Sequence, residues 1–141
     1  MNSHFEKNDE STSVPHLELI DSGLPREVHH RLSYKQVTQE QAYELVGYKL
    51  SGWVVLFCDA NGTPYLHSGK PFYRLKPDPE QLTGDDPPKY LSPKGAGCRP
   101  YFSPLATAEK FNTCKKLFIT EGEKKGDALT HHASSCIIRE G

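Results

Sequence analysis

The chain has 141 residues, of which 35% are hydrophobic and 25% charged, and its formal net charge is −1. This length fits one domain of ordinary size, and no apolar run approaches the roughly 20 residues that a membrane-spanning helix needs. Because the polar segment 1–10 lacks the hydrophobic region of a secretory signal, we expect a cytoplasmic protein with no membrane segment.

The N-terminal part of the sequence predicts short helices. Residues 1–15 are polar and are expected to be disordered, whereas 16–52 form a helical segment. Pro25 is well placed as the first residue of a helix, because its missing N–H would be unpaired there. Thr38 and Gln41 have the spacing of a capping box, and Gly47 is expected to end the helix that follows.

Residues 53–104 predict a small β-rich region. The continuous apolar run Trp53–Cys58 is typical of a buried strand, and the Asn-Gly pair at 61–62 is typical of a turn. A return strand is expected over 65–75, with an interruption around 68–71. Two further short strands are expected at 89–91 and 100–102.

Residues 105–141 predict an α/β unit. The segment 107–113 has the pattern of a helical turn, Leu117–Thr120 that of a short buried strand, and 123–132 that of a helix with Ala128 and Leu129 facing inward. A second strand is expected at 134–138. Since such a β-α-β unit is usually parallel, Glu121 would lie at the carboxyl end of its first strand, where functional side chains gather in open α/β sheets. The alternative is that this acid only stabilises the first turn of a helix.

Charge is unevenly distributed along the chain. Residues 89–125 contain eight basic and three acidic side chains, and Tyr90, Tyr101 and Phe102 lie among them. This pattern indicates a polyanion-binding surface, and the alternative is a solvated lysine-rich surface. The four cysteines are widely spaced and the histidine pairs are adjacent, so we expect neither a zinc site nor a disulfide framework.

The segment 117–129, L-F-I-T-E-G-E-K-K-G-D-A-L, resembles the first motif of Toprim domains, and more narrowly the form found in plasmid- and phage-type primase-like proteins. Three further segments resemble, in matching order, the stretch that precedes this motif in the same primase-like group: V-V-L-F-C-D-A-N-G-T-P (54–64), K-Y-L-S-P-K-G-A-G-C-R (89–99) and Y-F-S-P (101–104). The segment H-L-E-L-I-D-S-G-L (16–24) resembles the opening of an uncharacterised, mainly bacterial domain with a Toprim-like core. The resemblance covers residues 16–141.

The resemblance implies roles only for residues that match the motif or flank it. Glu121 matches the Toprim glutamate, a Mg²⁺ ligand or general acid/base in phosphoryl transfer, and Gly122 matches its partner glycine. The residues expected to bind nucleic acid or nucleotide are Lys89, with Lys94 and Arg99 flanking it and Lys124 and Lys125 extending a basic rim. Each of these could equally be an ordinary solvated side chain.

Toprim chemistry also needs a D-x-D pair on a later strand, and no such pair follows Glu123. The expected fold is therefore α+β, with N-terminal short helices, a small antiparallel β region, and the start of a Toprim-like α/β core that stops after two strands. The sequence is then a fragment or a truncated gene product, catalytically silent by itself, with Mg²⁺ bound only in the complete family member.

Three functions remain open. The first is the N-terminal part of a Toprim primase-like DNA replication protein that acts on nucleotides or DNA with Mg²⁺, together with a helicase domain or partner. The second is a noncatalytic nucleic-acid-binding module, in which aromatic side chains stack on bases. The third is a protein-interaction domain with no role in nucleic-acid binding.

Overall fold

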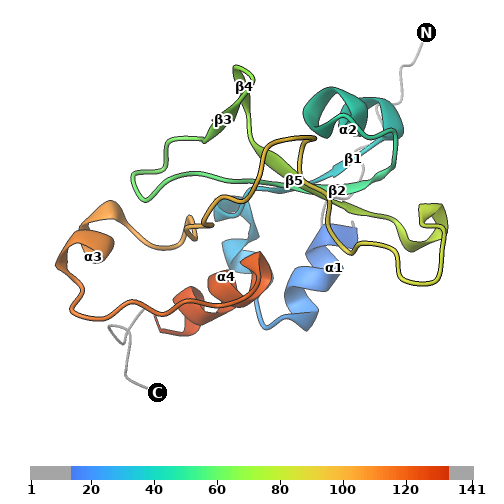
Figure 1. Cartoon of the computed structure of the whole chain (residues 1–141). Coiled ribbons are helices and arrows are strands. Elements are labelled where there is room, and N and C mark those ends of the chain that lie inside the picture. The colour runs from blue at the N-terminus through green and yellow to red at the C-terminus, as the bar shows by residue number, and fades with distance from the viewer. Residues whose placement is uncertain (1–13, 134–141) are drawn as a thin grey trace, which may run out of the picture.

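A computed structural model describes residues 14–133, and a three-stranded antiparallel sheet lies at its centre (Figure 1). The strands, in spatial order, are β1 (Tyr34–Val37), β2 (Gly52–Leu56) and β5 (Tyr73–Pro77). The helices that pack on this sheet are α2 (Gln39–Val46) on one face, and α1 (Val14–Asp21) and α4 (Glu123–His132) on the other. The mixed helix and strand content confirms the coarse α+β prediction.

The capping box predicted for α2 is confirmed. The Thr38 hydroxyl accepts a hydrogen bond from the Gln41 N–H, and the Gln41 side chain accepts one from the Thr38 N–H. At the other end of the helix, Gly47 adopts a φ of 83°, a left-handed conformation that side chains disfavour. Local sequence therefore determines both ends of α2.

The first helices also follow local signals. Gly23, with a φ of 86°, follows α1, and Pro25 precedes a 3-10 helix, η2 (Arg26–Arg31). The strand β1, by contrast, lies within the stretch 16–52, where the sequence indicated helices alone. It pairs with β2 in antiparallel register, with Tyr34 opposite Val55.

Strand β2 is buried on both faces, which explains its continuous apolar sequence. Val54 faces α2, and Trp53 and Val55 face the opposite side, beneath α1 and α4. The cluster on the α2 side consists of Val37, Ala42, Val46, Val54 and Leu75. The cluster on the other side consists of Trp53, Val55, Phe57, Phe72 and Ala96.

The return from β2 to β5 contains a small hairpin, which confirms the interruption expected around 68–71. Its strands, β3 (Leu66–His67) and β4 (Lys70–Pro71), have two residues each. Ser68 and Gly69 join them with φ values of 50° and 76°. Two successive positive φ values are characteristic of a type I′ turn, whose twist matches that of paired strands.

The strands expected at 89–91 and 100–102 are not formed. Leu91 alone makes a bridge, in which it exchanges two backbone hydrogen bonds of 2.7 and 2.8 Å with Leu75. Pro93 follows the first of these segments and Pro100 begins the second, and neither proline has an N–H to donate to a ladder. A 3-10 turn, η3 (Pro79–Gln81), and a helix, α3 (Ala108–Thr113), are the remaining elements, and α3 confirms the predicted helical turn.

The buried strand predicted at Leu117–Thr120 is wrong. This segment forms no strand, and Leu117 and Ile119 are 59% and 88% exposed. An apolar run becomes a buried strand only where a neighbouring strand and a covering layer are present, and the described residues provide neither here. Helix α4 is confirmed over 123–132, whereas the strand predicted at 134–138 lies outside the described residues.

Within residues 14–133, no helix combines the length and the apolar character needed to cross a membrane.

Candidate functional site

Glu121 lies immediately before α4 and is open to solvent. Its side chain is 80% exposed, and its carboxylate pairs with the Lys125 ammonium one helical turn later. The hydrogen bond and the positive charge of Lys125 lower the pKa of Glu121. Since such an exposed pair is weak, Glu121 remains accessible to a ligand.

Gly122 is the N-cap residue of α4, and its φ of −156° is extended backbone that any residue adopts. A Cβ added at this position would meet nothing within 4 Å. Neither conformation nor packing within the described residues therefore requires a glycine here. The resemblance implies that another group approaches Gly122 closely, and no described residue is that group.

The inward side of α4 carries two acids. Of the two apolar residues expected there, Ala128 does pack inward, against the cluster of Leu19, Leu24, Leu32 and Leu105. Glu123 and Asp127 are 4% and 0% exposed, whereas Leu129 is 38% exposed, so the prediction that Leu129 faces inward is wrong. Glu123 accepts a hydrogen bond of 2.8 Å from Arg74 of β5. The apolar pattern missed this because the partner of Glu123 lies 49 residues earlier in the sequence.

Asp127 is the acceptor of two phenol hydroxyls. The Tyr34 hydroxyl donates to it at 2.7 Å, and the Tyr101 hydroxyl donates at 3.0 Å. Burial raises the pKa of Asp127 to about 6, against the lowering effect of hydrogen bonds from Ser103 and from both phenols. Burial also raises the pKa of both tyrosines, so the phenols remain protonated donors.

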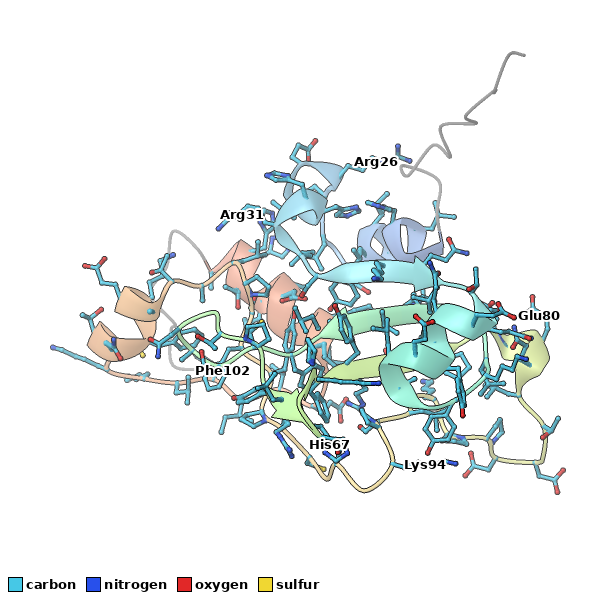
Figure 2. All side chains as sticks on the ribbon, turned by 90° about the horizontal axis from the view of Figure 1, so that it is seen from above. Arg26, Arg31, His67, Glu80, Lys94 and Phe102 are labelled. Carbon is cyan, nitrogen blue, oxygen red and sulfur yellow. The ribbon has the colours of Figure 1, made fainter. Side chains whose placement is uncertain are left out.

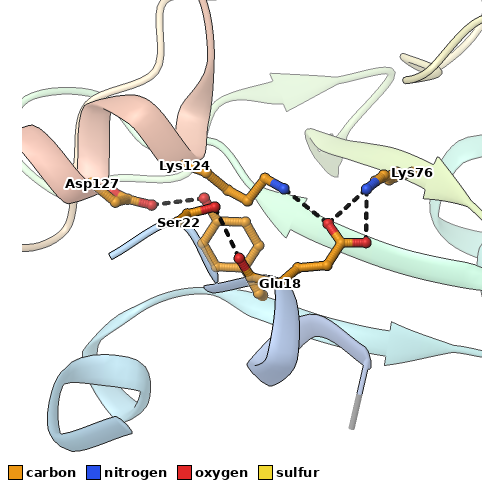
Figure 3. A network of polar contacts seen from close by, with 6 residues as sticks. Glu18, Ser22, Lys76, Lys124 and Asp127 are labelled. Atoms are coloured by element: carbon orange, nitrogen blue, oxygen red, sulfur yellow. Dashed lines mark hydrogen bonds and ion pairs between the residues drawn. The ribbon is translucent and has the colours of Figure 1, made fainter. Parts of the chain in front are cut away.

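Lys124 does not belong to an exposed basic rim. Its ammonium lies 2.8 Å from the carboxylate of Glu18 in α1, which also accepts hydrogen bonds of 2.6 and 2.7 Å from Lys76 of β5 (Figure 3). Burial alone would raise the pKa of Glu18, but the two lysines together lower it. Helix α4 is thus held to α1 and to the sheet through charged groups.

Trp53 lies beneath this network. The Lys76 and Lys124 ammonium groups lie 5.5 and 5.8 Å from the centre of its ring, within the range of cation–π attraction. The indole N–H is buried and has no hydrogen-bond partner among the described residues. Both lysines are therefore structural contacts of the single tryptophan.

The other predicted basic residues are on or near the surface. Lys89 and Lys94 are exposed, and the Lys94 ammonium lies 5.3 Å from the Tyr48 ring centre. The Arg99 guanidinium lies 5.3 Å from the Phe72 ring centre and donates to the Ala96 carbonyl at 2.6 Å. No contact within the described part of the chain joins Glu121 to any of these three cations.

A pocket of about 350 Å³ lies apart from Glu121, on the side of α3. The loop around Asp59, the segment 102–108 and the side chain of Arg31 line it. Phe102 and Phe111 meet edge to face at 5.1 Å beside it. No signal in the sequence indicates this pocket, because its walls come from three separate stretches of the chain.

The described residues do not form the set of Mg²⁺ ligands that the resemblance implies. Residues 14–133 contain no group of three or more His, Cys, Asp or Glu side chains that could hold a metal ion. Glu121 is a single carboxylate with a lysine partner, whereas Mg²⁺ needs further hard oxygen ligands. Asp127 and Glu123 already bind tyrosine and arginine side chains.

No protein-family model, curated protein or solved structure matches the chain.

Proposed function

We propose that this chain is the N-terminal part of a Toprim-type primase-like replication protein that acts on nucleotides or DNA, and that by itself it binds without catalysing. The Toprim-like core and the use of Mg²⁺ by the complete protein belong to this proposal. Its support from the sequence is the order of the matching segments across 16–141.

The proposal rests on one observation: some residues of the motif anchor helix α4, whereas another is exposed to solvent. Glu123, Lys124 and Asp127 anchor α4 to the sheet and to α1, whereas Glu121 is left in solvent at the end of the same helix. The fold therefore anchors the helix and presents beside it one exposed carboxylate, whose pairing partner is the exposed Lys125. A general base or a ligand carboxylate needs such a position, held firmly but accessible.

Catalysis by this chain is not expected, because one carboxylate cannot bind and position Mg²⁺ for phosphoryl transfer. A second acidic group would have to come from outside the described residues. Glu121 would then act only in the presence of that group.

Two assays on the purified chain test the proposal. Fluorescence anisotropy with a labelled 20-mer oligonucleotide at about 50 mM salt should show binding that weakens steeply as salt is raised. A Mg²⁺-dependent primer-synthesis or nicking assay should show no product. The control variant Glu121→Gln should fold and bind like the wild type.

Two results would contradict the proposal. If no oligonucleotide binds at this salt concentration, a role in handling nucleic acid is wrong and a protein-interaction domain becomes the better explanation. If the wild type synthesises or nicks and Glu121→Gln does not, the statement that the chain alone is silent is wrong.

A noncatalytic nucleic-acid-binding module is the second candidate. The ion pair between Glu121 and Lys125, spaced i to i+4, favours it, because the same geometry commonly serves only to stabilise a helix. Mg²⁺-dependent activity that disappears in Glu121→Gln would exclude this candidate, and it would also contradict the statement that the chain alone is silent.

A further inference from the structure

The tip of the β3–β4 hairpin places positive charge at the surface. Ser68 and Gly69 form the turn, and His67 and Lys70 are paired residues on either side of it. Lys70 is exposed, and so is Leu66 at the start of the hairpin. With only two residues in each strand, the hairpin projects from the sheet as a short arm (Figure 1).

A second turn places Lys94 in a similar position. The Ala96 N–H donates to the Pro93 carbonyl at 3.0 Å and closes a four-residue turn with Lys94 and Gly95 in its centre. Gly95 has a φ of 73°, the left-handed conformation that a type II turn needs at its third position. No atom lies within 4 Å of a Cβ added to Gly95, so the turn is open on that side.

The two turns lie against each other. The His67 ring nitrogen Nε2 is 3.1 Å from the Lys94 carbonyl oxygen, and both residues appear together at one edge of the molecule (Figure 2). This hydrogen bond joins segments that are 27 residues apart. Lys70 and Lys94 consequently lie on one surface, on two neighbouring turns.

Acidic side chains are absent from both segments. Residues 63–77 and 89–108 contain no Asp or Glu. One acid that acts on this surface is Asp59, which contributes, after burial, to raising the pKa of Tyr65. Its Oδ1 already accepts hydrogen bonds from the N–H groups of Asn61 and Thr63, so its charge is partly satisfied within its own turn.

Aromatic rings border the same surface. Tyr48 lies under the Lys94 ammonium, and Tyr65 begins the hairpin segment near Arg99, whose charge acts to lower the pKa of that tyrosine. Positive charge beside aromatic rings suits a single strand, because phosphates meet the cations while bases stack on the rings. Neither turn offers the paired donors and acceptors that would distinguish one base from another.

We propose that these two turns, with Lys70, His67, Lys94 and Arg99, form a surface that binds single-stranded nucleic acid without sequence selectivity. The inference rests on the proposed function and names the surface responsible for it. Lys124 is excluded from this surface, because its charge is already paired with Glu18.

The test compares two charge-reversal variants with the same change in net charge. Lys70→Glu/Lys94→Glu alters both turns, whereas Arg26→Glu/Arg31→Glu alters two exposed residues on η2, at the opposite edge of the molecule (Figure 2). Circular dichroism and Trp53 fluorescence check that each variant is folded. If the turn variant does not fold, Lys70→Gln/Lys94→Gln takes its place in the same assay, with Arg26→Gln/Arg31→Gln as the matched control.

Binding of labelled 20-mer DNA and RNA oligonucleotides is measured by anisotropy over a range of salt. The turn variant should bind about tenfold more weakly at low salt. A plot of log affinity against log salt should be less steep for it than for the wild type, by about 1.4, or about 0.7 for each lost phosphate contact. The η2 variant should stay within about twofold of the wild type, as expected of residues that make no phosphate contact.

Three outcomes would overturn the proposal, and each refutes a different part of it: the function, the surface or the kind of partner. If the wild type binds neither oligonucleotide, the proposed function fails and the surface fails with it. If the wild type binds and both variants weaken equally or not at all, the surface is wrong while the function stands. If polyglutamate of similar length binds as tightly as the oligonucleotides, the partner is not nucleic acid.

Discussion

Replacing Asp127 by Asn tests the polar contacts that hold α4 in place. Asn keeps one acceptor oxygen for the phenols of Tyr34 and Tyr101, but it cannot ionise. The substitution therefore removes the titration of a fully buried carboxyl group while it largely preserves the shape of the side chain. The prediction concerns how the free energy of unfolding changes with pH.

The pKa of Asp127 rises from 3.8 to about 6 on folding, chiefly because of burial. The folded chain consequently binds more protons than the unfolded chain between these two values, so the contribution of Asp127 to stability is fully present below pH 3.8 and is lost as pH rises through 6. A difference of about two units corresponds to about 3 kcal/mol, of which about 2.5 kcal/mol falls between pH 4 and pH 7.

Urea unfolding followed by the fluorescence of Trp53, the only tryptophan, measures this effect at pH 4, 5, 6 and 7. The quantity to compare is the free energy of unfolding of the wild type minus that of Asp127→Asn. This difference should decrease by about 2.5 kcal/mol from pH 4 to pH 7. The subtraction matters because Glu18, whose pKa is lowered, contributes with the opposite sign in both proteins, losing its stabilisation as pH falls below its ordinary value of 4.5.

A difference that stays constant over this range would refute the reasoning. It would mean that the hydrogen bonds from Tyr34, Tyr101 and Ser103 stabilise the carboxylate enough to offset its burial. A difference that increases with pH would show that these hydrogen bonds outweigh the effect of burial. The carboxyl carbon resonance of Asp127 provides an independent check, since its titration midpoint should lie near pH 6.

Three further substitutions follow from the packing, and urea unfolding measures each of them. Glu18→Gln leaves Lys76 and Lys124 facing each other without a counter-charge, so it should cost about 2 kcal/mol; a loss below about 0.5 kcal/mol would show that solvent screens the lysines. Gly52→Ala places a Cβ 2.1 Å from a backbone oxygen of β5 and should cost about 3 kcal/mol or more, and unchanged stability would contradict the β2–β5 register. Ser68→Asn creates the Asn-Gly pair preferred by type I′ turns and should add about 0.5 kcal/mol, whereas a loss would argue against positive φ at this residue.

Elements whose signals are local in sequence could be predicted. The capping box at Thr38, the stop at Gly47 and the interruption around Ser68–Gly69 each depend on residues within a few positions of one another. The apolar run from Trp53 was identified as a strand for a related reason, since burial on both faces leaves no polar position in it. In these cases the residues that determine the local structure lie close together in the sequence, so the sequence pattern predicts it.

Features that depend on distant partners could not be predicted. Leu117–Thr120 has the composition of a buried strand, but composition does not say whether a neighbouring strand is present. Glu123 and Asp127 face inward only because Arg74, Tyr34 and Tyr101 lie opposite them.

The candidate site shows the same limitation. Counting charges along the sequence assigned Lys124 to a basic rim, because its partner Glu18 is more than a hundred residues away. The same count placed Lys94 and Arg99 in the basic region, but it could not reveal that His67 brings the hairpin beside Lys94.

The contacts of α4 also bear on the order in which the protein folds during synthesis. Glu18 and Lys124 are separated by 106 positions, and Tyr34 and Asp127 by 93. Because a ribosome releases the chain from its N-terminus, α1 and the sheet emerge well before the helix that joins them. During that interval the Glu18–Lys76 pair lacks Lys124, and the face of the sheet that carries Trp53 lacks the cover that α4 later supplies. Completion of the fold is thereby tied to the translation of nearly the whole described chain.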